Sequence, residues 1–275
     1  MTTFQKVIKY LAIAFAIFFI VAIIGGILSA IGLFGGFFTG HTVTEDMQTY
    51  SVSTEIRKLD IEINAADLYI KEGDSFSVES NLKNLKVDDN NGRLTIKDLT
   101  RNKFFGGYSY ENAVLTIYVP VGTVFENVNL TTGAGRLTVD KLSAETIDFE
   151  LGAGDVSIGT LVATKSADIE GGAGRITVSG STLNNLDMDM GVGELNLTSA
   201  FSGECKLDMG VGESNITLIG NMDDYKLDLE KGIGSISVNG KDVSDFCSSG
   251  NGTNKVDISG GIGAINVRFE EAKAE

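Results

Sequence analysis

A Gly-x-Gly element occurs seven times between residues 133 and 263, mostly at nearly constant intervals. The second glycines of these elements are Gly135, Gly154, Gly174, Gly193, Gly212, Gly234 and Gly263. The successive steps between them are 19, 20, 19, 19, 22 and 29 residues. A fixed period near 20 residues is typical of solenoids, in which each unit buries its apolar face only by stacking on its neighbours. The repeat therefore constrains the fold more than any other feature of the sequence.

Apolar and polar residues alternate on both sides of each element, with the period of a β-strand. In the second coil, Ile147 and Phe149 precede the glycines, and Val156 and Ile158 follow them. Like strands stacked in parallel, about 4.8 Å apart, would bury these residues in one continuous core. We therefore predict an all-β fold, a right- or left-handed parallel β-solenoid with coils of 19–22 residues, regular over residues 131–270.

Residues 51–130 follow the same pattern in degenerate form. Asn64 and Ala66 take the two glycine places between alternating strands, and Gly92 and Ala113 mark two further coils. We expect these coils to stack in chain order with the regular ones, giving one domain of about ten coils over residues 51–270. The alternative is a separate small β-domain, residues 50–125, that caps a seven-coil solenoid.

The N-terminus has the pattern of a membrane anchor. Residues 11–38 are almost wholly apolar, and as a helix they would measure roughly 42 Å, enough to cross a ~30 Å hydrocarbon core. Lys6 and Lys9 precede this stretch, so the positive-inside rule places the N-terminus in the cytosol. We predict a cytosolic segment 1–9, a transmembrane helix 10–40, a linker 41–50, an extracytoplasmic solenoid and a tail 271–275. Cleavage near residue 31 is the alternative, although the stretch is long for a signal peptide.

Composition excludes several classes of protein. The formal net charge of −15 argues against nucleic-acid binding, which requires a basic surface. One histidine (His41) and two cysteines are too few for a His- or Cys-based metal site, and we predict no metal and no cofactor. Cys205 occupies an inward position and Cys247 lies in the insertion of the longest step, so we do not expect a disulfide.

Carboxylates stand four and two residues before the first glycine in most coils. Because both series alternate with inward residues, they are expected to form two outward columns. Our interpretation is a solvated face that discourages edge-to-edge association; the nonapeptide of calcium-binding solenoids is missing. The first series is Asp148, Asp168, Asp187, Asp228 and Asp257, and the second is Glu150, Glu170, Asp189, Asp208 and Glu230.

The residue after the second glycine alternates in sign over four coils, as Arg136, Asp155, Arg175 and Glu194. In register, these side chains would form exposed ion pairs worth about 0–1 kcal/mol each. A polysaccharide-cleaving β-helix would place carboxylates and arginines similarly, but stacked carboxylates meet the required separation in any solenoid. We therefore predict no catalytic residue and a protein that is not an enzyme.

The segment Arg101–Tyr110 combines four aromatic residues with two glycines and two cations. An apolar, locally basic patch on an acidic molecule would suit a partner protein or a cell-wall glycan. Phe104, Phe105, Tyr108 and Tyr110 are our candidate contact residues. The alternative is a loop that folds back to cover the first coils.

An N-terminal span, a strand ending in Ile117–Pro120, and the segment Val128–Val139 with its copies resemble the bacterial "putative adhesin" family of Gly-rich β-solenoid proteins. The resemblance covers about residues 50–270 and carries over no catalytic residue. It implies a single-pass membrane protein whose solenoid acts outside the cell as a surface interaction or adhesin-like scaffold. The alternative that it implies is an envelope-stress sensing module that binds a membrane-protein partner.

Overall fold

The computed structural model describes residues 40–41, 43–53, 55–100, 108–243 and 246–271. Two compact units divide the chain. The first contains residues 1–41 and 101–109, and its described part is a pair of two-residue parallel strands, β1 (Gly40–His41) and β7 (Tyr108–Ser109). The second unit contains residues 42–100 and 110–275 and holds all other strands.

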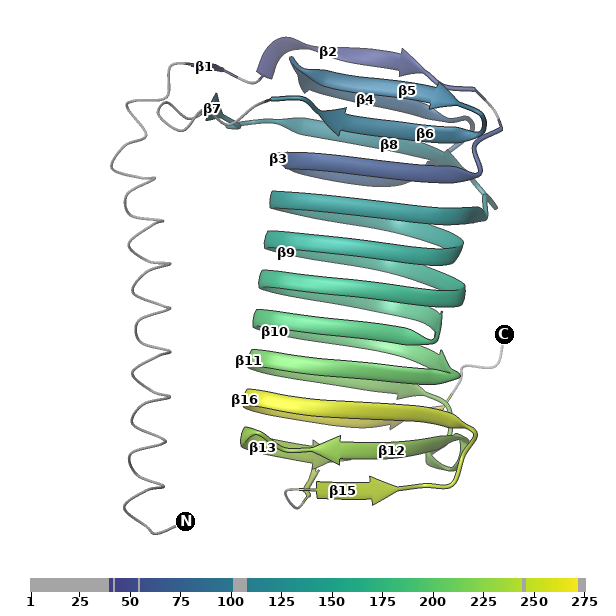
Figure 1. Cartoon of the computed structure of the whole chain (residues 1–275), viewed down its shortest axis with the longest axis vertical. Coiled ribbons are helices and arrows are strands. Elements are labelled where there is room, and N and C mark those ends of the chain that lie inside the picture. The colour runs from purple at the N-terminus through teal and green to yellow at the C-terminus, as the bar shows by residue number, and fades with distance from the viewer. Residues whose placement is uncertain (1–39, 42, 54, 101–107, 244–245, 272–275) are drawn as a thin grey trace. The chain divides into compact units, whose positions relative to one another are not determined.

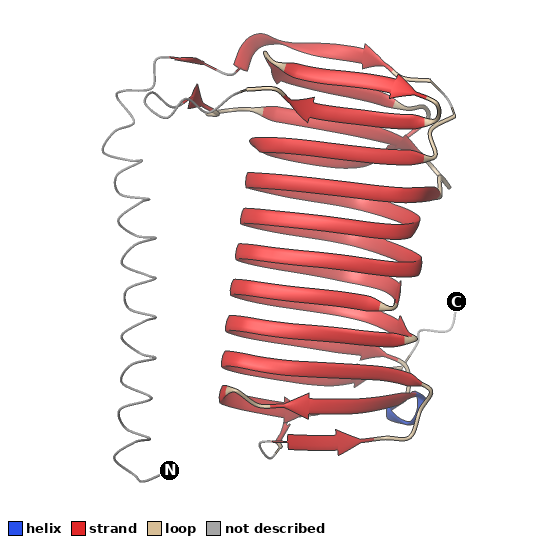
Figure 2. Ribbon diagram, viewed as in Figure 1, coloured by secondary structure: helices blue, strands red, loops and turns tan. Residues whose placement is uncertain are grey.

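The centre of the second unit is a regular stack of parallel coils (Figure 1). Three long strands form it: β9 (Phe125–Asn184), β10 (Leu186–Ser202) and β11 (Glu204–Ile219). Equivalent residues of neighbouring coils pair directly, as Asp187 does with Asp168 and Gly193 with Gly212. Strands account for nearly the whole unit in Figure 2. The predicted all-β fold with mostly parallel, repeating strands is therefore confirmed.

Alternate side chains point inward and form one hydrophobic core along the stack. Phe149, Leu195 and Leu207 are fully buried, while the polar residues between them face outward. The only departure among the sequence positions that we expected to be apolar is Ser214, which is buried and donates its hydroxyl hydrogen to the Met209 sulfur at 3.0 Å. Residues 56–96 and 113–130 contribute to the same core as the regular coils.

At the N-terminal end, the coils do not follow chain order. Strand β3 (Lys58–Gly73) stacks directly on β9, with Ala66 paired to Gly135. On its other side β3 pairs with two separate strands, β6 (Arg93–Asp98) and β8 (Val114–Pro120), which together make a single broken coil. The chain-order stack that we expected from Gly92 and Ala113 is therefore wrong at this end.

Antiparallel strands cover this N-terminal end. β5 (Leu85–Asn90) pairs with β6, β4 (Ser77–Leu82) pairs with β8, and β2 (Val43–Ser51) pairs with β4. The turn between β5 and β6 contains Asn91 and Gly92, both at positive φ (52° and 73°), the conformation of a type I′ turn. Gly92 is thus a hairpin residue and not the solenoid corner that we predicted.

The C-terminal end departs from chain order in the same way. The last strand, β16 (Asn254–Glu270), inserts between β11 and the preceding coil, which consists of β12 (Tyr225–Glu230) and β13 (Ile233–Val238). Cys205 consequently pairs with Val256 of β16 and not with a residue of β12, the next strand along the chain. A short 3₁₀ helix, η2 (Met222–Asp224), precedes β12; β14 (Lys241–Asp242) and β15 (Phe246–Ser249) add antiparallel pairs beyond β13 and β12.

No helix long and apolar enough to span a membrane occurs among the residues that the structure describes. The predicted transmembrane helix, residues 10–40, lies almost entirely outside them, since the description begins at Gly40. The anchor and the location of the solenoid therefore stay predictions.

Candidate interaction surface

The Gly-x-Gly corner is fixed by contact between coils. An ideal Cβ atom on either glycine of any of the seven elements would come within 1.7–2.3 Å of a carbonyl oxygen in a neighbouring coil. The second glycine also lies at positive φ, between 121° and 150° in all seven. A side chain at these places would therefore force the coils apart, and only glycine fits both the contact and the backbone conformation.

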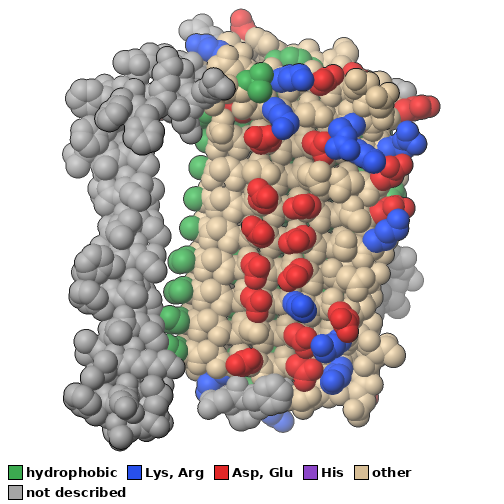
Figure 3. Space-filling view, in the orientation of Figure 1, with side chains coloured by type: hydrophobic (Ala, Val, Ile, Leu, Met, Phe, Trp, Pro, Cys, Tyr) green, Lys and Arg blue, Asp and Glu red, His purple; other side chains and the backbone are tan. Residues whose placement is uncertain are grey.

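The middle residue of each element points away from the core and forms an apolar column, which we call the corner ridge. Direct pairing links its members, for example Ala173 to Val192 and Val211 to Ile262. Val192 and Ile233 are 40% and 42% exposed. Figure 3 shows hydrophobic side chains along this edge. In spatial order the ridge consists of Ala65, Ala134, Ala153, Ala173, Val192, Val211, Ile262 and Ile233.

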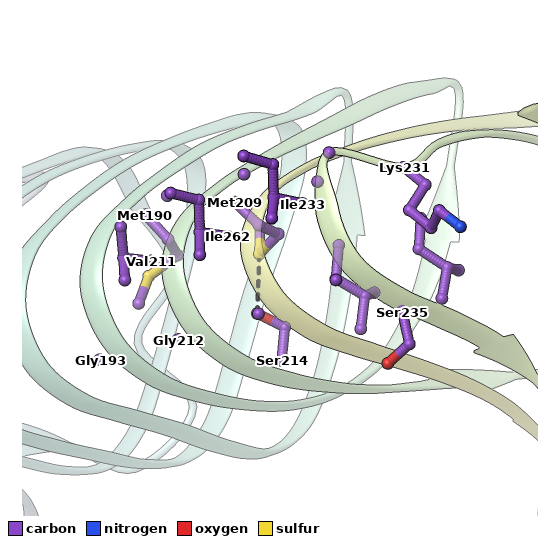
Figure 4. Close-up of a pocket in the computed structure, with 18 of the residues that line it drawn as sticks. Met190, Gly193, Met209, Val211, Gly212, Ser214, Lys231, Ile233, Ser235 and Ile262 are labelled. Atoms are coloured by element: carbon purple, nitrogen blue, oxygen red, sulfur yellow. Dashed lines mark hydrogen bonds between the residues drawn. The ribbon is translucent and has the colours of Figure 1, made fainter. Parts of the chain in front are cut away.

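The space beneath the ridge is too small for a ligand. Two hollows there have volumes of about 20 Å³ each, near the minimum for one water molecule. Met190 and Met209 line the hollow beneath Val211, Ile262 and Ile233, which lie in a row along the corner in Figure 4. Binding at this corner must therefore use its outer surface.

Two acidic columns run along the face before the corner, as predicted. Asp168 pairs with Asp187, and Asp189 pairs with both Glu170 and Asp208. They are visible as two lines of carboxylates in Figure 3. The pKa of Asp168 is raised, first by partial burial and then by the charges of its neighbours Asp148 and Asp187. Like charges in register are therefore held together at an electrostatic cost.

Opposite charges alternate along the other side of the corner, also as predicted. Arg175 lies 2.9 Å from the Glu194 carboxylate and 4.0 Å from that of Asp155. Arg136 reaches Asp67 at 3.6 Å. The Arg175 side chain is 58% exposed, so each of these pairs contributes little to stability.

An asparagine ladder next to these pairs was not predicted. The Nδ2 atom of Asn215 donates to Oδ1 of Asn196 at 3.1 Å, and Asn266 donates to Asn215 at 3.0 Å. Asn196 also donates to Glu194 at 2.7 Å, which is the main reason that the pKa of Glu194 is lowered. The sequence does contain a signal for this ladder, since Asn stands three residues after the second glycine in three of the coils. Stacked amides of this kind hold neighbouring strands in register.

A hollow of about 440 Å³ lies at the N-terminal end, beside the turn of the β5–β6 hairpin. Arg57, Lys58 and Arg93 line it. Glu126 lies 3.7 Å from Arg57 and 3.6 Å from Lys58, and Arg93 forms an ion pair with Asp60. Because Arg57 and Lys58 share Glu126, three cations face two carboxylates here, and the hollow keeps only a small excess of positive charge for an anion.

The structure places one of the four aromatic candidates in detail. Tyr110 is half-buried against the core, and its hydroxyl oxygen is buried without a hydrogen-bond partner. Burial and the charge of Asp98 raise its pKa. Phe104 and Phe105 lie outside the described residues, and only the backbone of Tyr108 is described, in β7. Their role as contact residues stays a prediction.

Among the described residues, no group of three or more His, Cys, Asp or Glu side chains could hold a metal ion. Cys205 is buried as expected and unpaired; its Sγ donates to the carbonyl oxygen of Ser202 at 3.5 Å, and burial raises the thiol pKa. The side chain of Cys247 lies outside the described part of the chain.

Stacked glycine-cornered coils with capped ends define a class of β-solenoid that presents regular columns of side chains. The chain belongs to the Toastrack DUF4097 family, whose model matches residues 56–268. This confirms the resemblance that the sequence suggested. No curated protein matches the chain.

Several solved structures are similar to it. A "putative cell adhesion protein" from Clostridium sporogenes is 15% identical, with a TM-score of 0.41 over 82% of this chain and 99% of that one. A "putative adhesin" from Bacteroides fragilis is 11% identical, with a TM-score of 0.36 over 82% and 99%. A "putative lipid binding protein" from Parabacteroides distasonis is 15% identical, with a TM-score of 0.35 over 83% and 96%. None of these similarities assigns an activity to this protein.

Proposed function

We propose that the protein is an interaction scaffold, anchored in the cell membrane by residues 10–40, that displays its solenoid outside the cell and has no catalytic role. One observation carries the proposal. Parallel register converts single residues of each repeat into columns of like side chains, namely the corner ridge, the two acidic columns and the asparagine ladder. Such columns offer an extended, regular surface, as solenoids use in binding.

The chemistry of the exposed groups supports a binding role. The arginine and carboxylates next to the corner are exposed and paired with one another, for example Arg175 with Glu194 at 2.9 Å. A catalytic pair would need a water-excluding cleft around it, and the hollows at the corner are about 20 Å³ in volume. The partner that we expect is an extracytoplasmic protein or a cell-wall glycan.

In-cell photo-crosslinking tests the proposal. A photoreactive amino acid would replace Val192 on the ridge, Tyr108 in the aromatic segment, or Thr182, an exposed position that serves as the control. A discrete adduct from Val192 or Tyr108, absent at Thr182, would support an interaction scaffold. A membrane-protein adduct would favour the sensing alternative, and a cell-wall adduct the adhesin-like one. Equal, weak labelling at all three positions would contradict both.

The location is tested separately with a membrane-impermeant maleimide, in a Cys247→Ser background. Ser157 is exposed on the solenoid, so Ser157→Cys should be labelled in intact cells. Lys6→Cys, on the predicted cytosolic side, should be labelled only after lysis. The reverse pattern would contradict the proposed display outside the cell.

A further inference from the structure

The half of the corner ridge with the larger side chains forms an aliphatic strip that is exposed at its two ends, Val192 and Ile233, and half-exposed between them. Its four members, Val192, Val211, Ile262 and Ile233, come from four coils that stack directly on one another. Three steps of about 4.8 Å make the strip roughly 14 Å long. The other half of the ridge contains only alanine. Apolar surface is therefore concentrated at the C-terminal end of the solenoid.

Carboxylates flank this strip on both sides. Asp189 and Asp208 pair on the side before the corner, and Glu194 and Glu213 pair on the side after it. Burial, the charge of Asp208 and then those of other acidic neighbours raise the pKa of Asp189, so a cation here would relieve repulsion. In the next coil, which carries Ile262, the places of Asp208 and Glu213 are taken by Ser259 and Ala264, so the paired carboxylates lie on the Val192 and Val211 coils. Lys231 lines the far end of the strip, near Ile233 (Figure 4).

The charges decide between possible occupants. A second copy, related by a two-fold axis, would set acidic flanks against acidic or mixed flanks, with Asp189 and Asp208 facing carboxylates. An anionic bilayer would be repelled in the same way. A partner with an apolar stripe between two rows of cations would satisfy both the strip and its flanks.

An α-helix has the matching spacing. Its side chains repeat along one face about every 5.4 Å, against about 4.8 Å for the ridge. The two spacings differ by about 0.6 Å per step, so they remain in phase over the three steps of the strip and lose register over a much longer contact. The match therefore favours a short helical segment of three or four turns.

We propose that the Val192–Val211–Ile262–Ile233 strip is a docking site for a cationic amphipathic helix, whose apolar stripe covers the strip and whose Lys or Arg side chains pair with Asp189, Asp208, Glu194 and Glu213. This inference rests on the proposed function, because it names the class of partner that the scaffold binds. The helix lies along the solenoid axis, across the strands, and contacts the strip through about ten residues.

The test uses the full chain in nanodiscs of zwitterionic lipid, with empty nanodiscs as the blank. The probe is a fluorescent 14-residue Leu/Lys peptide with one apolar stripe, and its scrambled isomer is the control; anisotropy reports binding. Val211→Asp should weaken binding about tenfold or more. Asp189→Asn with Asp208→Asn should weaken it up to about fivefold per carboxylate, and less at high salt. Ala134→Asp, on the same ridge but outside the strip, should change nothing.

Several results would overturn the proposal. The peptide could bind the protein no more strongly than it binds empty nanodiscs, or the scrambled peptide could bind as tightly as the amphipathic one. Ala134→Asp could also weaken binding as much as Val211→Asp does. Self-association that Val211→Asp abolishes would make a second copy the occupant. The double Asn variant changes only surface carboxylates, so it decides the question even if Val211→Asp fails to fold. Failure here would still leave any crosslink from Val192 or Tyr108 standing, so the proposed function would be judged separately.

Discussion

At the corner of each coil, the direction of the Cα–Cβ bond decides which residue can stand there. For both glycines this direction points along the stack at a neighbouring carbonyl oxygen. The middle residue lies on the outside of the corner, exposed or half-exposed. In β3, the corresponding places hold Asn64 and Ala66. There the broken coil leaves room, and Asn64 donates to Asp98 at 3.0 Å and to the Thr100 carbonyl at 3.2 Å. A side chain is thus tolerated only where no continuous coil lies above.

Gly172 and Gly180 lie in the same coil, and neither has a positive φ. Replacing them therefore tests the contact between a Cβ atom and the neighbouring coil without adding backbone strain. A Cβ on Gly172 would lie 2.2 Å from the Gly152 oxygen, whereas one on Gly180 would be 3.6 Å from its nearest neighbour. Gly172→Ala should lower the free energy of unfolding by about 2–3 kcal/mol or more. Gly180→Ala should leave it unchanged or raise it by up to about 1 kcal/mol. Urea unfolding measures both; equal effects would contradict the steric account.

Two carboxylates should respond to pH with opposite signs. The pKa of Asp168 is raised, so its ionisation opposes folding above the folded-state pKa, and the penalty disappears as the pH falls below the unfolded value near 3.8. The pKa of Glu194 is lowered by Asn196 and Arg175, so its contribution is present above the unfolded value and lost as the pH falls through the folded one.

Asp168→Asn should therefore stabilise the protein at pH 7, and Glu194→Gln should destabilise it. Both differences from the wild type should shrink towards pH 3. Chemical unfolding at pH 7 and at low pH measures them. A destabilising Asp168→Asn at pH 7 would show that the acidic column is held by interactions that we have not identified.

The elements divide into those that local pattern predicts and those that it does not. Strand periodicity, the corner and both acidic columns follow from single repeats, because parallel register carries each residue type to the next coil. The order in which the coils stack does not follow from single repeats. The apolar patterns of β3 and β16 would fit the observed neighbours and the neighbours in chain order equally well. The turn Asn91-Gly92 and the turn Asn239-Gly240, both at positive φ, were readable hairpin signals that mark the capped ends.

The order at the C-terminal end makes an asymmetric prediction. Ile265 in β16 and Ile236 in β13 are both buried and pair with each other. Ile265→Asp should increase amide hydrogen exchange in β16 and also in β12 and β13, which stack on it. Ile236→Asp should expose β13 while β16 stays protected on β11. Hydrogen exchange measured by mass spectrometry distinguishes the two orders. If β12 and β13 stayed protected in the Ile265→Asp variant, the result would contradict the observed order and favour a stack in chain order.

On the scale of the whole molecule, one core runs from the N-terminal cap to the C-terminal cap. Antiparallel strands close both ends, which protects the open edges of the stack from other chains. The outer surface consists of columns whose composition changes slowly from coil to coil. The length and position of any binding surface are therefore set by the number of coils and by their register.

Removal of one complete coil tests this account most directly. Deletion of residues 172–190 joins Gly171 to Gly191, and because Gly171 pairs with Met190 the register of every column is kept. Deletion of residues 172–180 removes only part of a coil, including the Gly172–Gly174 corner, so the following strand loses its register with its neighbours. We predict a single cooperative unfolding transition for the first variant and no folded protein for the second. Loss of folding in both variants would contradict a solenoid whose surfaces are built by register alone.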